Sequence, residues 1–235
     1  MVDVTPSLLE KITNHFNNSL KTDKKYLRII KRIENKKLSW DLANDYSIRL
    51  GELLSNSLTT FITPDSLPNG RFYYNIANEI LTTTLTRNQS MIADVAEIVQ
   101  AFQNERAGIG IKALRPTLDN DRIKGFIDKV SNAEDFASVD WVLKEPIVNY
   151  SQSVVDDAIK QNARFQAKAG LRVNVEREAE AHACAWCRAL SGTYNVSESF
   201  EIPHEVFQRH ENCRCKVTYN SVKLKPYMVT TFRAD

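Results

Sequence analysis

The chain has 235 residues and a formal net charge of +2 at pH 7, with 43% hydrophobic and 26% charged residues. This length is enough to bury a substantial core, and the composition is that of a globular protein rather than a disordered or fibrous one. The small net charge gives no overall attraction to nucleic acid or to a membrane. No basic segment followed by a long apolar one marks the N-terminus as a signal peptide, and no stretch has the roughly 20 apolar residues that span a bilayer. We therefore expect the chain to act in a cytoplasm.

The first third of the chain predicts helices. A first helix is expected at Thr5, whose hydroxyl would cap it, with Pro6 at the first helical position. The basic run 21–37 has helical spacing, and its charges are expected to form a solvated helix face. From Ser39 onward, apolar residues recur at three- and four-residue spacing and predict a long helix that packs against others. The apolar stripe consists of Leu42, Tyr46, Leu50, Leu53, Leu54, Leu58 and Phe61.

Proline and glycine residues divide the middle of the chain. A loop is expected over 64–70, which contains two prolines and a glycine. A second long helix is predicted from about Tyr73 to Arg106, because its apolar residues keep the same period, and the glycines at 108 and 110 would end it. Ser131 and Glu134 have the spacing of a capping box, which predicts the start of a shorter helix.

The period of the sequence changes near residue 170. Pro146 is expected to open a last long helix, which Gly170 would end. Beyond it, apolar and polar residues alternate over 171–179 and again over 215–220, and a two-residue period is typical of strands. The sequence therefore predicts an α+β fold that is mainly α, with a helical body over 1–169 followed by a small β-rich module over 170–235.

All four cysteines lie in this C-terminal module. Cys184-Ala-Trp-Cys187 has a spacing that lets a tight turn direct both sulfurs at one ion, and His210-Glu-Asn-Cys213-Arg-Cys215 follows roughly two dozen residues later. In a reducing compartment such crowding favours metal over disulfides. Cys184, Cys187, His210, Cys213 and Cys215 are therefore candidate ligands of one structural zinc ion, which would hold together strands too short to bury much core.

Five candidates compete for the four positions of a tetrahedral ion, and the sequence leaves open which of them is excluded. Cys213 and Cys215, two apart on a presumed strand, are expected to face the same side, and His210 suits a turn that leads into it. His210 is alternatively a neighbour that hydrogen-bonds a thiolate. The spacing of His182 and His204 fits poorly, so we expect them on the surface. The alternatives to metal are two disulfides or buried free thiols.

No enzyme is expected from these motifs. Nucleobase deaminases place a histidine and a glutamate before their Cys-x-x-Cys pair, whereas here the pair comes first, and no His-Glu-x-x-His is present. A thiolate-rich set with no position left for water is structural. Glu176, Glu178 and Glu180 loosely resemble the paired glutamates of ADP-ribosyltransferases, but are expected on the solvent face of the first strand.

Basic residues surround and follow the cysteines. Such a patch around a zinc module can contact DNA phosphates, and the competing expectation is a solvated surface. The residues concerned are Arg209, Arg214, Lys216, Lys223, Lys225 and Arg233.

Three motifs follow one another within Arg172–Tyr219: Cys-x-x-Cys at 184–187, Leu-x-Gly-x-Tyr at 190–194 and Arg-His-x-Asn-Cys-Arg-Cys at 209–215. In combination they resemble the C-terminal motif of the Mu F-like minor head proteins of tailed bacteriophages, and most of all the versions from phages of Gram-positive hosts. A helical N-terminal region also suits that family without being specific to it. The resemblance implies that Trp186 and the 190–194 motif support the module by packing and turn formation.

The resemblance further implies a non-enzymatic virion component, made in the host cytoplasm and placed in the head interior or at the portal vertex. Such a protein would be present in several copies, bind the portal protein and by extension the major capsid or scaffold protein, and act in head assembly and in DNA packaging or ejection. Contact with phage DNA would be compatible with this role, and no membrane contact is implied. Two hypotheses from other classes remain: a nucleic-acid-binding zinc protein, and a zinc nuclease of the treble-clef kind.

Overall fold

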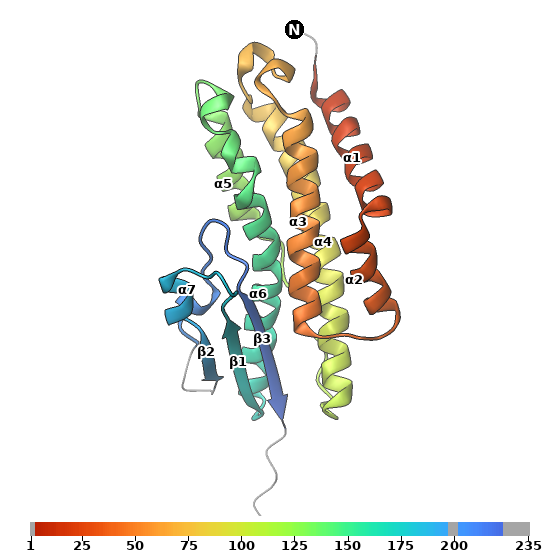
Figure 1. Ribbon diagram of the computed structural model, residues 1–235, viewed down its shortest axis with the longest axis vertical. Helices are drawn as coiled ribbons and strands as arrows, with labels where there is room; N and C mark the ends of the chain where they lie inside the picture. Colours follow the sequence, from red (N-terminus) through yellow and green to blue (C-terminus); the bar gives the residue numbers. More distant parts are fainter. Residues whose placement is uncertain (1–2, 197–201, 223–235) are drawn as a thin grey trace, which may run out of the picture.

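The computed structural model describes residues 3–196 and 202–222. Most of this part is helical, and a small three-stranded sheet follows the long helices (Figure 1). The fold is thus α+β and mainly α, as the sequence predicts. The α-helices are α1 (Thr5–Thr22), α2 (Lys24–Glu34), α3 (Trp40–Phe61), α4 (Tyr74–Arg106), α5 (Asn120–Ser131), α6 (Glu145–Lys168) and α7 (Ala185–Ala189). None of these helices is long and apolar enough to cross a membrane.

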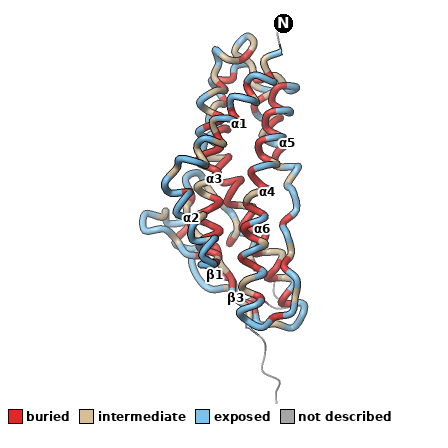
Figure 2. The backbone as a smooth tube through the Cα atoms, turned by 90° about the vertical axis from the view of Figure 1, so that its right-hand side faces the viewer, coloured by how far each residue is buried: buried red, intermediate tan, exposed pale blue. Residues whose placement is uncertain are grey.

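The long helices form an elongated bundle. Helices α3, α4 and α6 pack against one another along its length, with α1 and α2 on one side and α5 on another (Figure 1). Buried residues follow the inward faces of these helices, while the outer faces are exposed (Figure 2). The predicted stripe of α3 is buried in this core from Leu42 to Leu58, because it faces both α1 and α6. Residues 64–70 connect α3 to α4 through two short 3-10 turns.

The sheet consists of β1 (Arg172–Glu178), β2 (Gly192–Val196) and β3 (Lys216–Val222), in the order β2-β1-β3 with both pairings antiparallel. Val175 on the central strand lies opposite Tyr194 on β2 and Tyr219 on β3. The buried face of the sheet joins the same apolar cluster as the helices. Helix α6 ends near the predicted boundary, where Gly170 has a φ of +80°, a conformation that favours glycine. The core nevertheless runs across this boundary without a break.

Two helix starts differ from the sequence predictions. Val4, not Thr5, is the N-cap of α1 and makes no side-chain cap; instead the Asp3 carboxylate accepts the Thr5 backbone N–H at 3.0 Å. The capping-box prediction at Ser131 is wrong, because Ser131 is the last residue of α5 and Asp119 caps the start of that helix. The buried apolar residues before Ser131 have helical spacing and continue the helix to it, so packing overrides the local motif; they are Ile123, Ile127 and Val130.

Charged residues attach the C-terminal segment to the bundle. Arg209 forms a two-point ion pair with Asp156 of α6 at 2.6 and 2.7 Å, and both side chains are almost fully buried. Arg214 forms a similar pair with Glu145 at the start of α6. Lys216 contacts Asp45 of α3 at 2.8 Å. These three members of the predicted basic patch are therefore engaged within the molecule, and Lys223, Lys225 and Arg233 lie outside the described residues.

Helices α3 and α6 approach each other closely at Gly51. A Cβ atom there would lie 2.7 Å from the Ser151 hydroxyl oxygen and 3.0 Å from the Val148 Cα. We expect Gly51→Ala to lower the free energy of unfolding by about 1–3 kcal/mol, because the helices must move apart. Gly125 of α5 has no atom within 4 Å of the same position, so Gly125→Ala should raise it by about 0.5–1 kcal/mol through helix propensity alone. Urea unfolding followed by circular dichroism measures both changes, and equal effects would contradict the close approach.

Candidate metal centre

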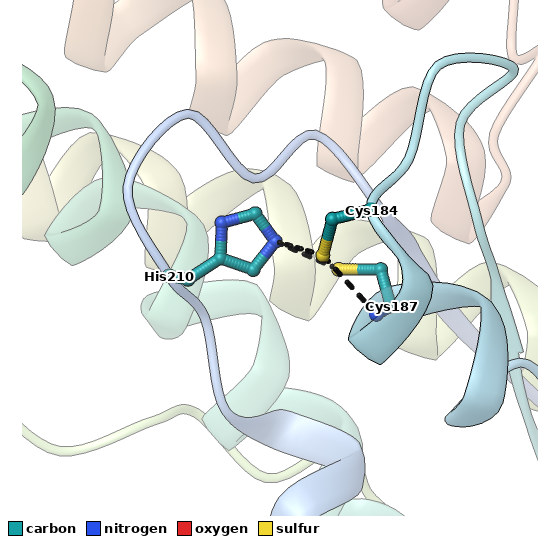
Figure 3. Close-up of side chains that lie close together, drawn as sticks. All are labelled: Cys184, Cys187 and His210. Carbon is teal, nitrogen blue, oxygen red and sulfur yellow. Dashed lines mark hydrogen bonds between the residues drawn. The ribbon is translucent and has the colours of Figure 1, made fainter.

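The five sequence-predicted metal residues come from two segments that meet beside the sheet. Cys184 and Cys187 lie in the connection from β1 to β2, where Cys184 caps the short helix α7 and Cys187 lies within it. His210, Cys213 and Cys215 lie between the 3-10 turn His204–Phe207 and β3. The structure therefore brings together residues that are up to 31 positions apart in the chain. Figure 3 shows the imidazole of His210 directed at the sulfurs of Cys184 and Cys187.

The donor atoms form two overlapping groups, and Cys187 belongs to both. His210 Nε2 lies 3.4 Å from Cys184 Sγ and 3.0 Å from Cys187 Sγ. Cys187 Sγ lies 3.8 Å from Cys213 Sγ, and the sulfurs of Cys187, Cys213 and Cys215 are all within 4.8 Å of one another. Two thiolates on a tetrahedral zinc ion are separated by about 3.8 Å, given Zn–S bonds of about 2.3 Å. These donors thus have the spacing of a metal site.

Backbone geometry places these side chains. The Cys184 sulfur accepts the backbone N–H of Cys187 at 3.4 Å, which closes the Cys-x-x-Cys turn. In the second segment Asn212 has a φ of +59°, and the Cys213 N–H donates to the His210 carbonyl at 3.1 Å. Asparagine tolerates this left-handed conformation better than most residues. The turn reverses the chain between the histidine and the next cysteine.

The hydrogen bond of the other ring nitrogen fixes the tautomer of His210. Its Nδ1 lies 2.6 Å from the Glu211 carbonyl oxygen, which can only accept, so Nδ1 carries the proton. In a neutral imidazole Nε2 then presents its lone pair to Cys184 and Cys187. Metal-bound histidines are commonly oriented by a carbonyl in this way. This orientation leaves the Nε2 lone pair available to a metal ion or to a thiol hydrogen.

The cysteines are free, and three of them are deeply buried. Cys187, Cys213 and Cys215 are each 1–2% exposed and form a small cluster separate from the main core. Cys184 is exposed. None of the four forms a disulfide, so the disulfide alternative is not realised here.

A buried arginine lies against the cysteines. Arg177 of β1 is 1% exposed, and its Nη2 donates to the sulfurs of Cys187 and Cys213, both at 3.7 Å. Its Nη1 donates to the backbone carbonyls of Val206 and Gln208. Within residues 3–196 and 202–222 no carboxylate comes within ion-pair distance of this guanidinium. The sulfurs are thus the groups placed to carry the compensating negative charge.

Sequence reasoning missed Arg177. Alternation places it on the same face as Val173 and Val175, which are buried, and an arginine in phase with buried valines is the signal that could have identified it. Its guanidinium also lies over the ring of Trp186, 5.6 Å from the ring centre, and the same ring approaches His210 edge-on at 5.7 Å. Trp186 therefore packs between a charged group and a donor of the site.

The cysteine pKa values differ with their surroundings. The backbone N–H of Cys187 lowers the pKa of the exposed Cys184 thiol. Burial raises the pKa of Cys187 to about 12. Burial acts in the same direction on Cys215, but hydrogen bonds from the Cys187 thiol and the Glu180 backbone outweigh it, so the pKa of Cys215 is lowered. A divalent ion would displace the remaining protons, because only thiolates bind it.

The remaining sequence candidates lie outside the donor groups. His182 and His204 are exposed, as expected, and neither belongs to a donor group found among the described residues. Glu176, Glu178 and Glu180 are exposed as well. In the 190–194 motif the Tyr194 hydroxyl donates to the Leu190 carbonyl at 2.8 Å and fastens the turn before β2.

Chemically, the five donors suit a closed, thiolate-rich site that could hold a metal ion. Comparison of the chain with protein-family models, with curated proteins and with solved structures finds no match. The function therefore has to be argued from the residues and their geometry.

Proposed function

We propose that the chain is a zinc-stabilised, non-catalytic minor head protein of a tailed bacteriophage, of the Mu F-like type, that binds the portal protein. It would act in head assembly and in DNA packaging or ejection, from a position in the head interior or at the portal vertex. The helical bundle would provide the surface that binds the portal or its neighbours. The proposal is supported by one observation: the cysteines and the histidine of the family-like motif lie together in one cluster.

Zinc is the ion that the donors fit best. Four sulfurs and one imidazole nitrogen are soft and borderline ligands, which favour zinc over calcium or magnesium. Cys187 and His210 would be joined by two of the other three cysteines. When bound, the ion would supply cross-linking between the two segments rather than a reactive water.

The buried Arg177 is the observation that carries the metal site. Burying an unpaired cation costs several kcal/mol, and protonated thiols would not offset it. A zinc ion bound by three thiolates and one imidazole has a net charge of −1, and four thiolates would give −2. Either complex would compensate the guanidinium that lies 3.7 Å from two of its sulfurs.

The two hypotheses from other classes are a treble-clef zinc nuclease and a nucleic-acid-binding zinc protein. A treble-clef nuclease needs a further catalytic histidine beside the metal set, and within the described residues His210 is the one histidine in the donor groups. We therefore expect no cleavage of plasmid DNA with any added divalent metal. A nucleic-acid-binding role has independent support from the exposed basic residues of segment 21–37.

Metal content tests the site directly. Protein purified without chelator should contain about one zinc per chain, and its thiols should react only after a chelator is added. Cys187→Ser should abolish binding, because Cys187 belongs to both donor groups, whereas His182→Ala should leave it unchanged. Protein without metal and with four freely reactive thiols would remove the basis of the proposal.

Arg177→Leu tests the charge compensation. We expect zinc affinity to fall by about 10- to 100-fold, the range typical when a group that contacts metal ligands is lost. The metal-free protein should be destabilised little, because the same change removes a buried charge. Arg172→Gln, an exposed arginine on the same strand, is the control. Competition with a chromophoric chelator measures the affinity, and equal affinity in all three proteins would show that Arg177 has no electrostatic role.

Portal binding tests the assembly role. Co-expression with the portal protein encoded in the same genome should yield a complex that survives size-exclusion chromatography. A metal-free Cys187→Ser variant that still binds would place the contact on the helical bundle. Failure of the zinc-loaded protein to bind would refute the portal assignment and leave the metal site intact.

A further inference from the structure

Positive charge is concentrated on one short segment of the bundle. Residues 21–37 contain eight lysines and arginines and two acidic residues, a net charge of +6, whereas the whole chain has a net charge of +2. All eight basic residues are exposed. We call their side chains the α2 basic surface.

These charges have almost no partners inside the molecule. Among the described residues, one of the eight has a carboxylate within ion-pair distance: Arg32 lies 3.5 Å from Asp45, which is itself held more closely by Lys216. Of the two acids in the segment, Asp23 accepts hydrogen bonds from the guanidinium of Arg49 in α3. This interaction lowers the pKa of Asp23 to about 2. Glu34 is the remaining acid, so the surface stays strongly positive.

The stability of α2 does not explain this charge. Lys24 and Lys25 lie in its first turn, where the helix dipole disfavours a cation. Lys36 follows the helix end with a φ of +53°, in a position where glycine is usual and other residues are strained. The backbone bonds from Lys36 to Ile33 and from Lys37 to Arg32 show that this is a glycine-type helix ending. The sequence thus keeps lysine at positions where local structure disfavours it.

The charges also have a defined arrangement. With about 3.6 residues per turn, five basic residues of α2 fall within a stripe about 120° wide; they are Lys24, Lys25, Arg28, Lys31 and Arg32. The opposite face of the helix, with Tyr26 and Ile29, is buried in the bundle core. Figure 1 shows α2 at the edge of the bundle beside α3. The Asp23–Arg49 contact fixes its first turn, so the stripe is held in place.

We propose that the α2 basic surface binds the phosphate backbone of double-stranded nucleic acid without sequence preference. A row of flexible cations suits a polyanion with regularly spaced charges. No aromatic side chain of 21–37 is exposed for stacking on bases, because Tyr26 is buried, and this disfavours single strands. The apolar face of α2 is packed in the bundle except for Leu27, which is 44% exposed, and a single leucine is too little apolar surface to enter a lipid surface. The stripe has no apolar centre of the kind that protein interfaces depend on.

This proposal concerns a surface remote from the cysteines in sequence and holds whether or not zinc is bound. The exposed side chains agree with the expectation of a solvated helix face, and the proposal adds a ligand for that face. Arg209, Arg214 and Lys216, the described members of the predicted basic patch, are paired with carboxylates of the helices. The basic residues of the α2 basic surface, apart from Arg32, are not paired in this way within the part of the chain that the structure describes.

Salt-dependent binding to a random-sequence duplex tests the proposal. Fluorescence anisotropy with the full chain should give an affinity that falls steeply with salt. The triple change Lys24→Gln, Arg28→Gln and Lys31→Gln should lower the slope of log K against log salt by about 2 to 3, near 0.9 for each lost contact. Lys112→Gln, Lys168→Gln and Arg172→Gln remove the same charge from exposed positions elsewhere and are the control. Equal losses in the two triple variants would overturn the assignment to α2.

Lys36 provides a variant whose effect cannot be ascribed to misfolding. Lys36→Gly should raise the melting temperature, because glycine adopts the left-handed conformation without strain, and should still weaken duplex binding about two- to threefold, as should Lys36→Gln. Duplex affinity unchanged in both variants would count against the surface. Tighter binding to a single strand of equal length, or binding to anionic vesicles but not to the duplex, would refute the proposal in favour of another polyanion.

Discussion

A buried guanidinium group requires a buried negative charge, and the described part of the C-terminal module contains two such groups. Arg209 finds its counter-charge in Asp156 on helix α6. Arg177 finds no carboxylate among the described residues and instead faces the sulfurs of Cys187 and Cys213. Because an uncompensated charge in a protein interior costs several kcal/mol, the buried Arg177 restricts which groups can be stable beside it.

The two arginines stabilise different parts of the module: Arg209 contacts its backbone and Arg177 contacts its sulfurs. Arg209 donates to the Cys215 carbonyl as well as to Asp156, so one side chain connects α6 to the backbone of the cysteine segment. Asn149 of α6 donates to the His210 carbonyl at 3.0 Å. Helix α6 thus holds the backbone around the donor residues. The donor side chains lie close to one another, and two of them contact Arg177. A site built on such supports is positioned before any ion arrives.

The regular elements were largely predictable from sequence, because apolar spacing reports directly which face is buried. The stripe from Leu42 to Leu58 and the alternation around Val175 indicated the elements in which these residues are found. Ser131 and Thr5 were misjudged because a capping motif is short, and the packing of neighbouring turns outweighs it.

The sequence predicted the five donor residues of the candidate site but not the residues that surround them. Cysteine and histidine spacing carries the chemistry of metal binding, and all five candidates meet. The roles of Arg177 and Arg209 could not be read in the same way, because a charged residue shows its partner only when the chain is folded. Arg209 and Asp156 are 53 positions apart, and nothing local distinguishes Arg209 from a surface arginine. For the same reason, the sequence did not show that Arg209, Arg214 and Lys216 are paired with carboxylates. Nor did it show that most basic residues of α2 have no such partner among the described residues.

The contact between β3 and α3 has a consequence for the order of folding on the ribosome. Asn44 of α3 donates to the carbonyl of Val217, 173 positions later in the chain. The bundle helices are therefore translated before the strand that covers them. Asp156 and Asn149 lack their hydrogen-bond partners until Arg209 and His210 have been translated. A contact of such long range forms slowly, so β3 and the cysteine segment before it join a bundle whose helices have already been made.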